Sequence, residues 1–113
     1  MKNWTLRFRK ADKKNFDEVE CGEKSIETRA GTAKYQPIAV GDTLIFVCGQ
    51  ARCSKKITRK FNWPNIDTMV ADVDYKRVMP SVGSVAEMKK AYASYPDYEQ
   101  KIKEHGLLGF ELE

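Results

Sequence analysis

The fold is decided by the stretch TLIFVCGQARCSKKITRKF, residues 43–61. Its first six residues are mostly β-branched or aromatic, which predicts a strand inside the core. Gly49 and Gln50 turn the chain, and residues 51–61 predict the returning strand. Apolar and cationic side chains mix along that second strand. We therefore expect this returning strand to be long and twisted, with one side open to water.

Two strands and a helix are predicted before this hairpin. Residues 3–9, NWTLRFR, alternate apolar and polar side chains, which predicts a half-buried strand with two arginines on its outer face. Asp12 can cap a helix over residues 12–21, and Gly22 can end it. A second strand is expected over residues 24–29.

The C-terminal part is predicted to contain most of the helices. Residues 66–75 are ambiguous between a short helix and a strand. Residues 84–95 begin with the capping-box form SVAE, and after Pro96 a further helix is expected over residues 97–103. Residues 108–112 alternate as a final strand. The elements together predict an α+β domain whose small mixed sheet curls into a partial barrel.

Composition narrows the class of protein further. The chain has 113 residues and a net charge of +4, typical of one globular domain spanning residues 1–113. Its longest apolar run has five residues, Leu44–Cys48, against about 20 for a membrane span. Three cysteines and one histidine, without a CxxC pair, predict neither a disulfide framework nor a metal site. We expect a soluble, cytoplasmic protein that needs no cofactor; the sequence gives no clue to its oligomeric state.

The charge is divided unevenly along the chain. Residues 1–62 carry 14 Lys plus Arg against 7 Asp plus Glu, whereas residues 63–113 carry 6 against 9. The basic excess therefore lies entirely in the first half. Such an asymmetry favours an anionic partner, either nucleic acid or a phosphorylated small molecule.

Reactive side chains are concentrated in GEKSIETR, residues 22–29. Strand alternation predicts Ser25, Glu27 and Arg29 on one face, with Thr28 on the opposite face. Lys24 enters the strand where its ammonium can turn toward Glu27. The residues could converge on a polar site that orients an anion or moves protons. The alternative is a solvent-exposed strand face with weak ion pairs.

The motif Gly22-x-Lys24-x-x-Glu27-x-Arg29 is followed about a dozen residues later by VGDTLIF, residues 40–46. Further matches are the earlier helix with Phe16, the pair Tyr95-Pro96 and the ending GLLGF, residues 106–110. In order and spacing the chain resembles, over nearly its whole length, the ASCH domain family, whose fold is similar to the PUA domain. The resemblance implies a PUA-like small mixed β-barrel with two to three flanking helices.

It also implies a cleft lined by Lys24 and Arg29, with Glu27 between them. Family members are thought to bind RNA or nucleotides, and some look like enzymes. The expected partner is thus RNA or a nucleobase-containing small molecule, held through Lys24, Glu27 and Arg29.

An enzymatic alternative comes from one bacterial subgroup of the family, an amidohydrolase that removes the acetyl group from N(4)-acetylcytidine. The resemblance implies that Lys24 matches its lysine, whereas Glu27 stands where the subgroup has threonine. A nucleophile would then have to come from Ser25, and Glu87 is the candidate for a later acid. Cleavage of RNA by Lys24 and Glu27 as an acid–base pair is a further alternative. We favour a binding cleft.

Other side chains could extend the site. Arg7 and Arg9 on the first strand, and the cations of residues 55–60, could form a basic rim for phosphates. Trp63, Tyr35 and Phe61 lie near these charges in the sequence and could stack on a base.

Overall fold

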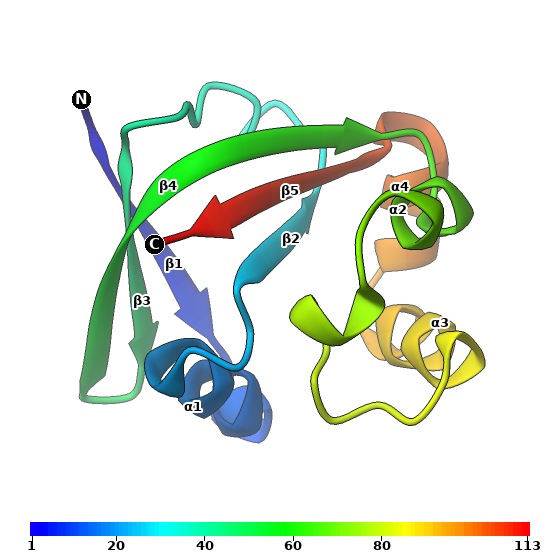
Figure 1. Ribbon diagram of the computed structural model, residues 1–113, viewed down its shortest axis with the longest axis horizontal. Coiled ribbons are helices and arrows are strands. Elements are labelled where there is room, and N and C mark those ends of the chain that lie inside the picture. The colour runs from blue at the N-terminus through cyan, green and yellow to red at the C-terminus, as the bar shows by residue number, and fades with distance from the viewer.

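The central hairpin forms the middle of the sheet in the computed structural model, which describes residues 1–113. Strand β3 spans Thr43–Cys48 and β4 spans Ala51–Trp63, two residues longer than predicted, with Gly49 at φ +60° in the turn between them. The other elements, drawn in Figure 1, are β1 (Asn3–Phe8), α1 (Lys13–Cys21), β2 (Ile26–Ala30), α2 (Ile66–Asp72), α3 (Val85–Ser94), α4 (Tyr98–His105) and β5 (Leu107–Leu112).

The five strands form one curled sheet in the order β1-β3-β4-β5-β2. Strand β1 pairs parallel with β3, and the remaining neighbours are antiparallel. Strands β1 and β2 are therefore the two free edges of a half-barrel. The predicted α+β class and partial barrel are confirmed, with four α-helices instead of two to three.

Two hydrophobic cores lie on opposite sides of this sheet. The first fills the half-barrel and includes Phe16 of α1, Phe46 and Ile57. The second lies between the sheet and helices α2, α3 and α4, which gather at one end of the molecule. It includes Phe61 and Trp63 from the second half of β4.

A β-bulge between Ile57 and Arg59 explains how one strand serves both cores. An extra residue in one strand reverses the side to which the following side chains point. Ile57 thus faces the half-barrel, whereas Phe61 and Trp63 face the helices. The apolar residues of β4 therefore lie on both faces of the strand, a change of face that the apolar pattern of the sequence does not reveal.

The helix ends agree with the sequence at most positions. Gly22 ends α1 at φ +88°, and the side chain of Ser84 accepts a hydrogen bond from the Glu87 amide, as the capping box predicts. Asp12 precedes α1 but its side chain caps nothing, because its carboxylate binds Arg9 instead. The ambiguous segment is the helix α2, whose start is capped by Asn65.

Two further observations concern membrane spans and metal sites. None of the helices has the length and the apolar character that crossing a membrane requires. The three cysteines are unpaired, and nowhere do three His, Cys, Asp or Glu side chains gather as a group that could hold a metal ion.

Candidate functional site

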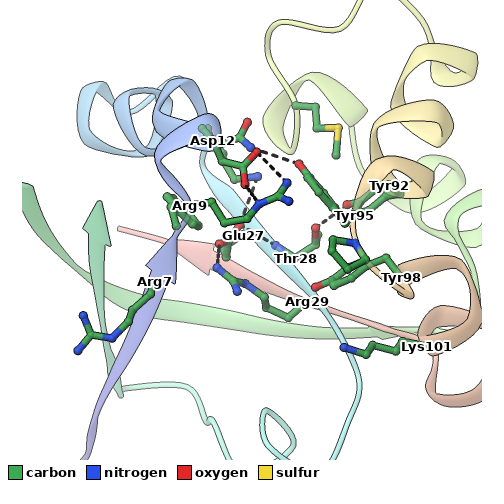
Figure 2. A pocket seen from close by; sticks show the side chains of 15 residues that line it. Arg7, Arg9, Asp12, Glu27, Thr28, Arg29, Tyr92, Tyr95, Tyr98 and Lys101 are labelled. Atoms are coloured by element: carbon green, nitrogen blue, oxygen red, sulfur yellow. Dashed lines mark hydrogen bonds and ion pairs between the residues drawn. The ribbon is translucent and has the colours of Figure 1, made fainter. Parts of the chain in front are cut away.

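A cavity of about 300 Å³ opens where the free edges of the sheet, β1 and β2, meet the connection between α3 and α4. This volume lies at the small end of the range for small-molecule sites. Figure 2 shows the side chains around it. They are Arg7, Phe8, Arg9, Asp12, Asn15, Lys24, Glu27, Thr28, Arg29, Met79, Tyr92, Tyr95, Pro96, Tyr98 and Lys101.

The three motif residues Lys24, Glu27 and Arg29 meet at this cavity. Glu27 lies between the two cations, with Oε1 3.3 Å from Nζ of Lys24 and Oε2 3.1 Å from Nη2 of Arg29. Their side chains are only 6%, 4% and 15% exposed, in chain order. The alternative of an open strand face with weak surface pairs is therefore excluded by their burial.

Electrostatics keep Glu27 ionised at this depth. Burial alone would raise the pKa of its carboxyl group, but the charges and hydrogen bonds of Lys24 and Arg29 outweigh burial and lower that pKa. Burial would likewise lower the pKa of Arg29, and the charge of Glu27 raises it instead. The cavity thus contains a permanent carboxylate held by a permanent guanidinium.

Lys24 is fixed from a second direction. Its Nζ donates a hydrogen bond of 2.5 Å to the carbonyl of Val78, in the segment between α2 and α3. The two oxygens close to Nζ, from Glu27 and from Val78, both accept hydrogen bonds from it. Lys24 therefore connects Glu27 to the segment between α2 and α3.

Aromatic rings hold Arg29 in place. Its guanidinium lies 5.4 Å from the ring centre of Phe8 on β1 and 5.7 Å from that of Tyr35. Such contacts attract a cation to the face of the ring. Since β1 and β2 share no backbone hydrogen bonds, the contact with Phe8 is a direct link across the open side of the half-barrel.

Side chains also occupy the free edge of β2. The amide of Thr28 donates to Oε1 of Glu27 at 3.1 Å, and the amide of Ala30 donates to the hydroxyl of Tyr98 at 3.1 Å. Because an edge strand is open along its side, residues from both of its faces can line the cavity. Thr28 does so although it points away from the face of Glu27, a role that alternation did not predict.

Three tyrosines of α3, α4 and the connection between them make the opposite wall, Tyr92, Tyr95 and Tyr98. The rings of Tyr92 and Tyr98 are stacked at 6.3 Å, and Tyr95 packs edge-on against both. Burial raises the pKa of all three phenols, so they are neutral at pH 7. The hydroxyl of Tyr92 lies 2.5 Å from that of Thr28. The sequence pattern predicted only helical packing for Tyr92 and Tyr95.

The mouth of the cavity is basic. Arg9 forms an ion pair of 2.8 Å with Asp12, whereas Arg7 and Lys101 form none. Five cations and two carboxylates line the cavity in all. Its surroundings therefore favour an anion. The prediction that Arg7 lies at the rim is consistent with this geometry.

Three other candidate residues lie elsewhere. Ser25 lies outside the cavity and accepts a hydrogen bond of 2.9 Å from Arg77. It precedes β2, so the alternation of side chains along the strand does not bring it to the face of Glu27. Glu87 binds the amide of Gly83 at the start of α3, so its role is that of a capping residue. Trp63 is 3% exposed, in the second core, because the bulge turns it toward the helices. It cannot stack on a ligand in this cavity.

Comparison with known proteins bears on the fold. No protein-family model and no curated protein matches the chain. A crystal structure of the hypothetical protein PH0355 matches with a TM-score of 0.83 and 26% identity, covering 100% of this chain and 98% of that one. The solution structure of protein PF0455 from Pyrococcus furiosus matches with a TM-score of 0.75 and 22% identity, covering 98% of this chain and 96% of that one. These likenesses establish the α+β half-barrel, which is consistent with a PUA-like domain.

Proposed function

We propose that this chain is an ASCH-type binding module that takes an RNA segment, a nucleoside or a nucleotide into the cavity between β1 and β2. The observation that carries the proposal is the buried set of Lys24, Glu27 and Arg29 at the floor of a basic, tyrosine-walled cavity. Such a site offers hydrogen bonds, an aromatic surface and positive charge together. These are the contacts by which proteins hold unstacked bases.

The hydrogen-bonding capacity left at the floor supports a base rather than a simple anion. Oε1 of Glu27 already accepts from the Thr28 amide and pairs with Lys24, while Oε2 pairs only with Arg29. A carboxylate oxygen can accept about two hydrogen bonds, so Oε2 retains one free position. Arg29 has about five N–H donors and uses one on Glu27. The floor would thus match an edge that carries an N–H donor beside a carbonyl or imine acceptor, as the Watson–Crick edges of bases do.

The wall of the cavity supports the same ligand. Tyr95, Pro96 and Tyr98 supply flat apolar surface beside the polar floor. Stacking of a base on an aromatic side chain contributes roughly 1–3 kcal/mol. An inorganic anion would gain nothing from these rings.

Binding is better supported than hydrolysis. The phenol of Tyr92 is the partner of the Thr28 hydroxyl, and its raised pKa makes it unable to take a proton at neutral pH. Glu27 has a lowered pKa, which makes its carboxylate a weak base. The amidohydrolase alternative therefore lacks an activated nucleophile among these side chains, and the ribonuclease alternative lacks a strong base.

Calorimetric titration with the four nucleoside monophosphates and with inorganic phosphate tests the proposal. Glu27→Gln and Arg29→Lys keep the size of each side chain but change the hydrogen-bond pattern and the forked donors. We expect each to weaken the best-bound nucleotide by about tenfold or more, the effect of losing one charge-assisted hydrogen bond. Lys90→Ala, at an exposed cation outside the cavity, is the matched control and should bind normally.

Two outcomes would remove the proposal. One is the absence of binding for all four nucleotides at millimolar concentration. The other is equal affinity of wild type and both cavity variants, provided that thermal unfolding shows the variants to be folded.

Hydrolysis is tested separately by incubating the protein with N(4)-acetylcytidine and with a labelled oligoribonucleotide. We expect neither to be converted at high protein concentration. Formation of cytidine or of shorter oligonucleotides that is lost in Lys24→Ala would replace the binding proposal by an enzymatic one.

A further inference from the structure

The mouth of the cavity carries cations on two sides that pair with no carboxylate. Arg7 extends from β1, and Lys101 extends from the first half of α4. Both residues are exposed, and neither forms an ion pair. Figure 2 shows Arg7 on one side of Glu27 and Arg29, pointing away from them, and Lys101 on the other side. A ligand seated on the floor would have free positive charge on both sides.

The positive surface continues beyond Arg7 across the outer face of the sheet. Arg7 pairs in register with Val47 of β3, which pairs with Arg52 of β4. Side chains at paired positions lie on the same face of a sheet. Val47 alternates with Phe46 and Cys48 of the first core, which places this row on the outer face, where Val47 itself is only 8% exposed. Arg7 and Arg52 are then two strand spacings apart, about 10 Å.

No carboxylate lies among the outward residues of β1, β3 and the first part of β4. The residues that alternate outward on β1, β3 and the first part of β4 are Asn3, Thr5, Arg7, Thr43, Ile45, Val47, Arg52, Ser54 and Lys56. Three of these are cations, and none is acidic. These three strands would attract phosphates, because none of their outward residues neutralises the arginines.

We infer that the cavity takes one base of a longer single-stranded nucleic acid, whose backbone crosses the mouth from Lys101 to Arg7 and continues over β3 to Arg52. This inference rests on the proposed function and deepens it. A nucleotide inside a strand has a phosphate on each side of its sugar, which matches free cations on both sides of the mouth. A free mononucleotide has one phosphate and would leave one side unused.

The inference is tested with cytidine, cytidine monophosphate and oligocytidylates of three and six nucleotides, measured by fluorescence anisotropy in competition and by calorimetry. We expect the hexanucleotide to bind at least about tenfold more tightly than the monophosphate at low salt, since each added phosphate contact releases counterions. Three phosphate contacts predict a slope of log K against log salt concentration of about −2.

Single variants assign the contacts. Arg7→Ala, Arg52→Ala and Lys101→Ala should each reduce the steepness of the hexanucleotide slope by about 0.7. Each should weaken the hexanucleotide more than it weakens cytidine. Lys90→Ala removes an exposed cation outside this path and should leave the slope unchanged. Glu27→Gln and Arg29→Lys should weaken cytidine and the hexanucleotide alike.

The outcomes separate this inference from the proposed function. If cytidine binds but the hexanucleotide binds no more tightly than the monophosphate, the strand path is wrong and the cavity proposal stands. If the hexanucleotide binds equally well to wild type and to Glu27→Gln, the strand does not enter the cavity and the inference is overturned. Absence of binding by cytidine, its monophosphate and the hexanucleotide overturns the inference, and the proposed function is removed as well if the other three nucleoside monophosphates do not bind.

Discussion

Two buried carboxylates, Glu27 on β2 and Asp42 just before β3, are stabilised by different means. Glu27 lies between two cations, Lys24 and Arg29, at the cavity. Asp42 forms no ion pair and accepts three N–H hydrogen bonds of 2.8–3.0 Å. The donors are the amides of Lys2 and Ala39 and the indole of Trp4.

The difference separates a structural carboxylate from a functional one. The three donors around Asp42 come from the residue before β1, from the Trp4 side chain on β1 and from the loop before β3, so they fasten the start of the chain to the hairpin. Around Glu27, the guanidinium of Arg29 has more donors than the carboxylate uses. Each N–H group around Asp42 has one hydrogen, which the carboxylate already uses, so no donor remains for a ligand. The guanidinium of Arg29 has further N–H groups that a ligand in the cavity could use.

The largest effect on stability is expected from Glu27→Ala. It would leave two buried cations without their common carboxylate, and removing one partner of a buried ion pair costs about 3–5 kcal/mol. Urea unfolding at pH 7 measures this loss. Glu99→Ala, at an exposed carboxylate, is the control. A loss below about 1 kcal/mol for Glu27→Ala would mean that water screens these three charges as it screens an exposed ion pair.

The second largest effect is a loss of stability at acid pH. The three hydrogen bonds lower the pKa of Asp42 to about 2, from about 3.9 in an unfolded chain. A depressed pKa contributes stability that is complete above the unfolded value and disappears as the pH falls toward the folded value. We therefore expect stability to fall between about pH 4 and pH 2.

Asp42→Asn tests this assignment by urea unfolding at several pH values. The variant should be less stable than wild type at pH 7, by less than Glu27→Ala, and should show a shallower decline below pH 4. An unchanged acid decline would assign the acid sensitivity to other carboxyl groups, such as Glu27, whose pKa is also lowered.

A smaller effect is expected from Trp4→Phe, which keeps an apolar ring but removes the indole donor to Asp42. Two amide donors would remain, so the pKa of Asp42 should rise from about 2 without reaching its unfolded value. Carbon-13 NMR titration of the carboxyl group measures this shift directly. If the pKa stays at its wild-type value, the indole does not contribute.

The smallest effect is expected at an exposed pair. Lys13 and Asp17 lie 3.0 Å apart on α1, with side chains 61% and 52% exposed. Exposed pairs gain little because water and salt screen them. Asp17→Asn should therefore leave the urea midpoint unchanged within error at both low and high salt. A clear destabilisation would show that exposed and buried pairs differ less than the comparison implies.

Local patterns in the sequence predicted most of the fold. Alternation located β1 and β5, and the apolar run followed by Gly49 located the hairpin. Two features depended on tertiary context. The bulge after Ile57 changed the side on which Trp63 lies. Gly109, which sits under the ring of Trp63 with no room for a Cβ, belongs to a strand 46 residues later and could not be paired with it beforehand.

The candidate site was predictable in part, for a related reason. Spacing in the motif brought Glu27 and Arg29 to one face, and the structure places them there with Lys24. Thr28 was missed because strand alternation assumes neighbours on both sides, and β2 has a neighbour on one side only. The tyrosine wall was missed because the spacing of Tyr92 and Tyr95 on a helix is equally typical of ordinary packing.

The hydrogen bonds from β2 to Glu27 and Tyr98 have a consequence for solubility. An edge strand with unpaired amides is a template on which another chain can add a strand, which leads to aggregation. Here the amides of Thr28 and Ala30 are already occupied by side chains of the cavity. The residues that form the candidate site therefore also protect the edge. Tyr98→Phe, which removes the hydroxyl that occupies the Ala30 amide, is expected to self-associate more readily than wild type.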